Sequence, residues 1–229
     1  MSIKINKHIN IIFFDIDNTL VNGYTQKYFL LFLFKRGYIG LSKIFLLYLW
    51  FFGYKIHLIK NIDPIMNYFL KFLKNFKKNQ LDLIVKDFFN NSIKNRIFKE
   101  AAQIIKEHQR GGDCIVFIST VISPIAEVLA HFFHVNHVIA TKLEINAGLY
   151  TGKICGKVLD GGNKLKFAKF FLESMKKEFV VRKTFFYSDH YSDIPLLNFV
   201  NEPYAVNPDD ILVKAAKKNN WQVLTFNKQ

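Results

Sequence analysis

The sequence predicts an α/β fold: a Rossmann-like, doubly wound parallel sheet with an all-helical segment inserted after its first strand. Two observations support this prediction. Short apolar runs bounded by turn signals are typical of buried parallel strands, and they occur at 9–14, 114–118, 137–140, 185–187 and 203–206. Amphipathic patterns of helical period lie between the later runs, at 125–133, 164–178 and 211–219. Alternation of strand and helix indicates a parallel sheet with helices on its faces.

The composition is that of a folded globular domain. The chain has 229 residues and a mass of 26.9 kDa, which fits one substantial domain or a domain with a smaller insertion. Half of the residues are hydrophobic, which excludes an intrinsically disordered chain. The two cysteines, Cys114 and Cys155, form no CxxC pair, which excludes a disulfide-stapled miniprotein and argues against a cysteine-based zinc site. A reduced, cytoplasmic compartment is the simplest interpretation.

Residues 22–110 differ from the rest of the chain in charge and in aromatic content. They contain 16 basic and 5 acidic residues and carry +11 of the net charge of +14, and 18 of the 37 aromatic residues fall within 22–90. Apolar residues recur at helical spacing, as at Phe69 and Phe72, and Asp63 followed by proline is typical of a helix start. We predict four or five helices here. The predicted division is an α/β core at 1–21 and 111–229 and a helical cap at 22–110.

The longest apolar runs lie in this cap, at 28–34 and 44–54, with basic residues between them. A spanning helix needs about 20 apolar residues, so neither run alone is expected to cross a membrane, and no signal peptide is recognisable. A basic, aromatic helical segment can instead lie at a membrane surface, where each basic residue gains about 1 kcal/mol near anionic lipid. Peripheral association with the inner face of the membrane is one hypothesis for the cap. Burial of its own helices and a dimer interface are the others.

Two carboxylates directly follow the first predicted strand. In an open α/β sheet the carboxyl ends of the strands form the ligand crevice, and Asp15 and Asp17 stand at such an end. Phosphoryl transfer needs a nucleophile beside a proton donor. Asp15 would attack phosphorus and form an aspartyl-phosphate, and Asp17 would protonate the leaving oxygen and later activate water. The alternative, that both carboxylates only cap a helix, leaves the partner motifs unexplained.

Asp189 and Asp193 follow the apolar run at 185–187. Asp15 and Asp189 would supply oxygen ligands to Mg²⁺, a hard cation that prefers carboxylates, waters and phosphate. Its charge would offset the repulsion between an anionic nucleophile and an anionic substrate.

Three further residues are candidates for binding phosphate. Ser119 ends the run at 114–118, and together with the backbone amide of Thr120 it can hold phosphate oxygens. Lys164 opens a helix after a Gly-Gly-Asn turn and can hold nucleophile and phosphate together. The simpler interpretations are a turn residue at Ser119 and a solvated helix lysine at Lys164.

These motifs resemble those of the haloacid dehalogenase (HAD) superfamily of phosphatases, in particular its phosphoserine-phosphatase-like branch. In chain order they are DxDxT at Asp15, Asp17 and Thr19, then Ser119, then Lys164, then Asp189 with Asp193. The resemblance covers the core, about residues 9–20 and 110–226, whereas the cap matches only in place, size and helicity. It implies the nucleophile and acid–base roles given above, phosphate binding by Ser119, Thr120 and Lys164, and a Mg²⁺ site made by Asp15, Asp189 and the backbone carbonyl of Asp17, with Asp193 in support.

The resemblance implies Mg²⁺-dependent hydrolysis of a phosphate monoester, and the cap would select the substrate. A basic, aromatic cap favours a bulky or amphiphilic substrate, such as a phosphatidylglycerophosphate-like lipid, and phosphoserine or another small metabolite is the alternative. Phosphotransfer to an alcohol and a decayed phosphate-binding or regulatory module are further alternatives. Nucleic acid is not an expected partner, because the aromatics form solid apolar runs and no interleaved stacking platforms. The oligomeric state stays open.

Overall fold

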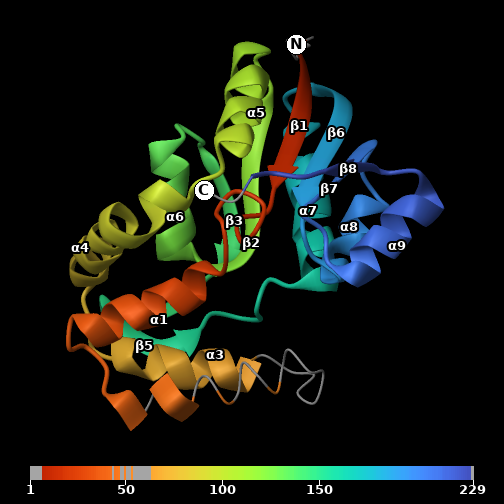
Figure 1. Cartoon of the computed structure of the whole chain (residues 1–229). Coiled ribbons are helices and arrows are strands. Elements are labelled where there is room, and N and C mark those ends of the chain that lie inside the picture. The colour runs from red at the N-terminus through yellow and green to blue at the C-terminus, as the bar shows by residue number, and fades with distance from the viewer. Residues whose placement is uncertain (1–6, 43, 47–48, 50–52, 54–62, 228–229) are drawn as a thin grey trace, which may run out of the picture.

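A six-stranded parallel sheet forms the centre of the computed structural model, which describes residues 7–42, 44–46, 49, 53 and 63–227 (Figure 1). The strand order is β3-β2-β1-β6-β7-β8. The strands are β1 (His8–Phe14), β2 (Cys114–Ile122), β3 (His137–Thr141), β6 (Val180–Ser188), β7 (Glu202–Val206) and β8 (Gln222–Leu224). The predicted fold class is confirmed, and each of the five predicted strands is present. β8 was not predicted, because it is a three-residue strand at the edge of the sheet and has no apolar run.

The central strand β1 is buried on both faces. Successive side chains of a strand point to opposite sides: Ile12 and Phe14 join one buried apolar cluster, and Ile11 and Phe13 join the other. All four are fully buried, and each such side chain stabilises the fold by about 1.5–3 kcal/mol. The first face is covered by α5 (Lys99–Arg110) and α6 (Ser123–Phe132), the second by α7 (Gly161–Met175), α8 (Ile194–Leu197) and α9 (Asp210–Asn219).

The helix starts differ from the predicted ones by a few residues. α7 was predicted from residue 164, but it begins at Gly161, with Asp160 at its N-cap. The turn-forming residues 161–163 thus belong to the first helical turn, and the backbone amide of Lys164 donates to the Asp160 carbonyl. Lys164 therefore stands in the first turn of α7, on a rigid element that holds its side chain in one direction.

Between β1 and β2 the described chain is helical. It comprises α1 (Thr25–Lys35), α3 (Asp63–Leu70), a 3-10 turn (Lys71–Leu73), α4 (Lys78–Phe88), a π-helical turn (Phe89–Ile93), a second 3-10 turn (Lys94–Arg96) and α5. The expected helix is present from Asp63, and the residues just before it, 61 and 62, lie outside the described ones. Most of the apolar run at 44–54 lies outside the described residues. The division into core and cap stays a prediction, and α5, the last helix of the interval, lies along β2 of the sheet (Figure 1).

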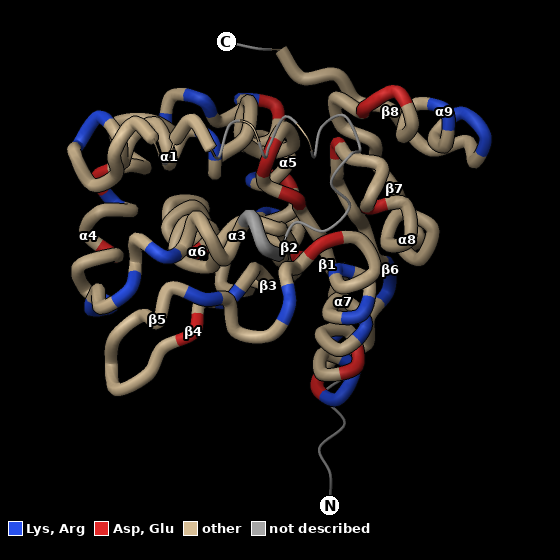
Figure 2. Tube along the Cα trace, turned by 90° about the horizontal axis from the view of Figure 1, so that it is seen from below, with Lys and Arg blue, Asp and Glu red and all other residues tan. Residues whose placement is uncertain are grey.

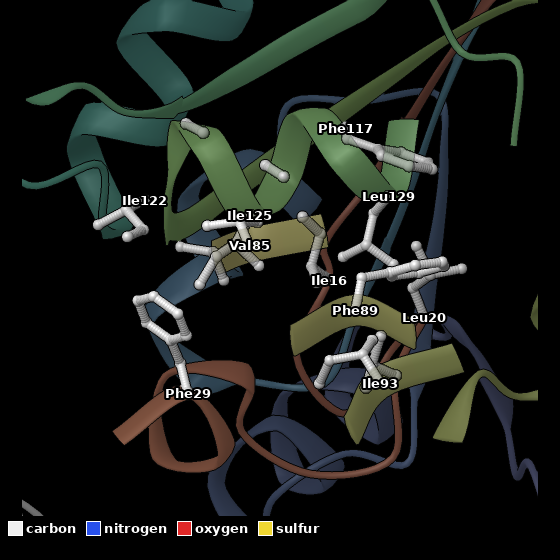
Figure 3. Close-up of a cluster of buried hydrophobic side chains, with 14 of the residues drawn as sticks. Ile16, Leu20, Phe29, Val85, Phe89, Ile93, Phe117, Ile122, Ile125 and Leu129 are labelled. Atoms are coloured by element: carbon white, nitrogen blue, oxygen red, sulfur yellow. The ribbon is translucent and has the colours of Figure 1, made fainter. Parts of the chain in front are cut away.

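The aromatic residues of this segment pack against one another and against the sheet helices. Phe29 of α1 is fully buried, and its ring centroid lies 4.9 Å from that of Phe88 and 6.2 Å from that of Phe69. Figure 3 shows Val85 of α4 facing Ile125 of α6 within the same buried cluster. The inserted helices and the sheet face covered by α5 and α6 thus share one apolar core.

A β-hairpin leaves the sheet and pairs with the inserted segment. It consists of β4 (Leu143–Asn146) and β5 (Leu149–Ile154), which are antiparallel. The Tyr150 amide donates to the Phe76 carbonyl, and the Tyr150 carbonyl accepts from Asn75. Gly152 has φ +78°, and a Cβ there would lie 3.0 Å from the Leu70 carbonyl oxygen, so this close approach requires glycine. The hairpin therefore ties the inserted segment to the core.

Charge is distributed over both parts of the molecule. Figure 2 shows Lys and Arg on α1 and α4, and also along α7 and α9 of the core. In the part of the chain that the structure describes, none of the helices combines the length and the apolar character that a membrane crossing requires.

Candidate active site

The strand register brings the predicted site residues to one edge of the sheet. Phe14 of β1 pairs with Phe117 of β2 and with Tyr187 of β6. Asp15 directly follows Phe14. Ser119 lies two positions after Phe117, and Asp189 lies two positions after Tyr187. Because β1 lies between strands reached by connections on opposite faces, this edge is the switch point at which open α/β sheets bind ligands.

Lys164 joins two acidic residues at this edge. Its Nζ donates to Asp15 Oδ1 at 2.8 Å and to Asp193 Oδ2 at 2.7 Å. Ser188, which is fully buried, also donates to Asp193 Oδ2, at 2.6 Å. The side chains of Lys164, Asp15 and Asp193 are 4%, 7% and 0% exposed, which excludes the solvated helix lysine as an interpretation of Lys164.

Burial and neighbouring charges set the protonation of this cluster. Burial by itself lowers the pKa of Lys164, but the charges of Asp15 and Asp193 and its hydrogen bonds to both outweigh that effect, so its pKa lies above the ordinary value. Burial raises the pKa of Asp15; the charge of Lys164 opposes the rise and that of Asp193 adds to it. Lys164 is therefore firmly cationic, and its charge keeps Asp15 closer to the carboxylate form.

Asp17 faces the start of α1. The backbone amide of Thr25, the first residue of that helix, donates to Asp17 Oδ1 at 2.9 Å. Burial raises the pKa of Asp17 to about 7, the Thr25 hydrogen bond opposes the rise, and the charge of Asp15 adds to it. A carboxyl group with such a pKa can both give and take a proton near neutral pH.

The loop after β6 is held by Asp209, the N-cap of α9. The Asp209 amide donates to the Asp189 carbonyl at 3.0 Å, and Asp209 Oδ2 accepts from the Tyr191 amide at 2.7 Å. Burial raises the pKa of Asp189 well above its usual range, and the charges of Asp15 and Asp193 add to that rise. His190, in the same loop, hydrogen-bonds Ser192 through Nδ1 at 2.9 Å.

The oxygen donors of this edge fit Mg²⁺. The acidic residues Asp15, Asp17, Asp189 and Asp193 are gathered around the single charge of Lys164, and the first three have raised pKa values. No described residue donates a hydrogen bond to the buried Asp193 Oδ1. A divalent cation would offset this excess of acid. Within the described ranges no three His, Cys, Asp or Glu side chains form a metal-binding group, so Asp15 and Asp189 would hold Mg²⁺ together with carbonyl, water and phosphate oxygens, as is usual for this ion.

Two asparagines make contacts at the site that the sequence did not anticipate. Asn18 adopts φ +51° and accepts the Gly23 amide, which closes the loop after Asp17. Asn207, beyond β7, donates to the Asn18 carbonyl at 3.2 Å. Neither side chain belongs to a catalytic pattern, although Asn is typical of turns and of left-handed backbone. Only the folded sheet brings residues 189 positions apart into contact.

Comparisons with known proteins agree with this architecture. The sequence model of the haloacid dehalogenase-like hydrolases matches residues 12–198. A histidinol-phosphatase of Neisseria meningitidis serogroup C is 31% identical over 219 residues, covering 95% of this chain and 99% of the relative. A phosphoserine phosphatase of Mycobacterium tuberculosis is 24% identical over 219 residues, covering 93% and 70%. The crystal structure of a protein of unknown function from Bordetella pertussis Tohama I superposes with a TM-score of 0.84 at 25% identity, covering 96% of this chain and 98% of that one.

Proposed function

The chain belongs to the haloacid dehalogenase-like hydrolase family, and from this premise we propose that it is a Mg²⁺-dependent phosphatase that hydrolyses a phosphate monoester through an aspartyl-phosphate. One observation carries the proposal: a buried lysine, Lys164, bridges Asp15 and Asp193 at the carboxyl edge of the sheet. A structural salt bridge alone would not require the surplus acid of Asp17 and Asp189 beside it. That surplus suits a site that receives a cation and a phosphate.

In the first step Asp15 attacks phosphorus. Lys164 holds Oδ1, so we assign the attack to Oδ2. The new bond joins Asp15 to phosphorus, and the bond from phosphorus to the ester oxygen breaks. Asp17 gives its proton to the departing oxygen, and its pKa of about 7 suits this task. Ser119, the Thr120 amide and Lys164 hold the transferred phosphoryl oxygens.

In the second step water attacks the same phosphorus. Asp17, now a carboxylate, takes a proton from the water, the bond from phosphorus to Asp15 breaks, and inorganic phosphate leaves. Held by Asp15, Asp189 and the Asp17 carbonyl, Mg²⁺ would supply positive charge against the phosphate oxygens. Asp193 keeps Lys164 in place.

For the substrate we propose a small phosphorylated metabolite, with histidinol phosphate as the first compound to test. The relative named histidinol-phosphatase matches this chain over nearly its whole length, and the second relative is named for phosphoserine. Both names specify a phosphate monoester of a small amine-bearing molecule. This proposal replaces the lipid phosphate that the aromatic cap favoured from the sequence, since many of those aromatics serve the cap's own core.

A lipid substrate is the second candidate, and one observation favours it. Leu41, Phe45 and Leu49 of the inserted segment are 68%, 65% and 51% exposed, and adjacent exposed apolar side chains can enter a membrane interface. Sedimentation with phosphatidylglycerol vesicles at low salt tests this reading. We would compare wild type with a Leu41→Ser/Phe45→Ser variant. Absence of wild-type binding would rule out the lipid reading and peripheral membrane association together.

The main test is phosphate release by the full chain with Mg²⁺, first from an aryl phosphate and then from histidinol phosphate, phosphoserine and lipid phosphates. Asp15→Asn should abolish release, and Asp82→Asn, in an exposed pair with Lys78, should not. Release that persists in Asp15→Asn would contradict the mechanism. Transfer of phosphate to an added alcohol would identify a phosphotransferase. Wild-type phosphate binding without turnover of any compound would point to a binding module.

A further inference from the structure

A bulge in β2 forms the loop proposed to bind phosphate. Ser119 and Ile122 of β2 pair with Ala140 and Thr141 of β3, which are consecutive residues. Thr120 and Val121 therefore have no opposite partners in β3. Bulged residues leave the ladder of backbone hydrogen bonds, and bulges recur beside active sites because they redirect the chain.

The carbonyl of Thr120 accepts hydrogen bonds from two side chains instead of from the neighbouring strand β3. Thr141 Oγ1 donates to it at 2.7 Å, and Gln26 Nε2, from the first turn of α1, donates at 3.3 Å. Both side chains are buried, Thr141 to 1% exposure and Gln26 to 8%. An unpaired carbonyl at such a depth would be costly, so these donors hold the peptide in a single orientation.

That orientation decides where the next amide points. In a trans peptide unit the carbonyl and the N–H point in opposite directions. With the Thr120 carbonyl directed at Thr141, the N–H of Val121 is directed to the other side, where it donates a hydrogen bond to Ser119 Oγ at 3.4 Å. The hydroxyl of Ser119 and the amide of Val121 are thus in contact with each other, at the edge where the proposed function places phosphate oxygens.

Thr141 also contacts the segment that leads into α7, the helix that carries Lys164. Its Oγ1 accepts the backbone amide of Leu159 at 3.1 Å, directly before Asp160, the N-cap of α7. One hydroxyl therefore connects the Ser119 loop, the end of β3 and the approach to Lys164. Its near-complete burial behind the loop keeps it from the substrate.

We propose that Thr141 is a positioning residue, which fixes the peptide between Thr120 and Val121 so that its N–H and the Ser119 hydroxyl receive phosphate. The inference rests on the proposed function of this loop. The structure supports Gln26 in the same role through a longer hydrogen bond.

The test is titration calorimetry of the full chain with inorganic phosphate in the presence of Mg²⁺, together with KM and kcat for an aryl phosphate. Thr141→Val keeps the shape and removes the hydroxyl, and we expect it to weaken phosphate binding about tenfold. Thr141→Ser retains the hydroxyl and should restore binding. Thr184→Val is the matched control, since Thr184 is a buried threonine that also donates to one oxygen and accepts one amide, both from Asn201.

Thr184→Val should lose stability and leave phosphate affinity within about twofold of wild type. Unchanged phosphate binding by a folded Thr141→Val protein would overturn the inference and leave the phosphatase proposal intact. Wild type that binds no phosphate would instead overturn the proposed function, and the inference with it. If Thr141→Val does not fold, Gln26→Leu carries the test, with an expected loss of about threefold; an unchanged affinity there would count against the inference.

Discussion

Two polar clusters of the described residues, one buried and one partly buried, differ in how completely the fold satisfies their hydrogen-bonding groups. The lysine cluster consists of Asp15, Lys164, Ser188 and Asp193. The histidine cluster consists of Asn10, His108, Asp113 and Tyr187. Tyr187 directly precedes Ser188 of the lysine cluster in the sequence. His108 lies 2.7 Å from Asp113 Oδ2 and 3.2 Å from the Tyr187 hydroxyl, and Asn10 donates to the other Asp113 oxygen at 2.9 Å.

The histidine cluster is complete within the fold. Both oxygens of Asp113 and both ring nitrogens of His108 have partners. The lysine cluster carries one lysine for two carboxylates, adjoins Asp17 and Asp189, and leaves Asp193 Oδ1 without a donor from any described residue. The contrast teaches that an ionisable cluster withdrawn from solvent does not by itself mark a functional site. A buried cluster whose charge the fold leaves unbalanced needs a ligand to complete it.

The same substitution in each cluster is expected to give the largest contrast. Asp15→Asn removes the proposed nucleophile and should lower kcat for an aryl phosphate about 10⁴-fold or more. Asp113→Asn alters a carboxylate that contacts no part of the proposed site, and its kcat should stay within about threefold of wild type. Steady-state kinetics of the two variants measures the difference. Equal losses would mean that the two clusters are not functionally distinct.

Removing Lys164 should give the largest loss of stability. Lys164→Met leaves Asp15 and Asp193 buried without their shared cation, and we expect a fall of about 3 kcal/mol in the free energy of unfolding. Urea denaturation in the presence of EDTA measures it. Lys183→Met is the control, because that lysine forms an exposed pair with Glu202 and should cost less than about 1 kcal/mol. A loss at Lys164 no larger than at Lys183 would contradict the account of the lysine cluster.

Mg²⁺ should stabilise the folded protein by binding beside the lysine cluster, where Asp189 is a proposed ligand. A ligand at 100 times its Kd adds about 2.7 kcal/mol to the free energy of unfolding, so the melting temperature should rise when MgCl₂ replaces EDTA. Asp189→Asn should lose most of this rise, whereas His108→Ala should retain it. Thermal melts of the three proteins provide the comparison. A full Mg²⁺ response in Asp189→Asn would remove that residue from the metal site.

Breaking the histidine cluster should have the smallest effect. His108→Ala removes two partly buried hydrogen bonds and should lower the free energy of unfolding by about 1–2 kcal/mol, with kcat/KM nearly unchanged. Denaturation and steady-state kinetics on the same preparation check both parts. A large loss of activity would show that the cluster acts on the site through Tyr187, whose carbonyl accepts the Asp15 amide.

The strand ends were predictable because a parallel strand that is buried on both faces has an uninterrupted apolar sequence. The runs before Asp15, Ser119 and Asp189 end where polar residues begin, so these residues could be placed at one edge before the structure was known. Lys164 was predictable from its place beside a helix start. Its contact with the nucleophile Asp15, 149 positions earlier, was expected, but its second hydrogen bond, to Asp193, was not.

Thr141 and Gln26 illustrate what the sequence pattern does not contain. Neither residue lies in a catalytic motif, and a buried threonine or glutamine is unremarkable in composition. Their role depends on the bulge at Thr120 and Val121, which is a mismatch in register between β2 and β3. Register is a relation between two strands, so no local pattern reveals it.

By itself the sequence determined the fold class, the order of the strands and helices that carry the motifs, and the chemistry of the proposed site, because apolar periodicity and residue type are local properties. The tertiary structure alone decided that Lys164 also joins Asp193, how the β4–β5 hairpin ties the inserted helices to the core, and which buried hydroxyl orients the Ser119 loop. These are contacts between distant segments, and they exist only once packing of the apolar core has brought those segments together.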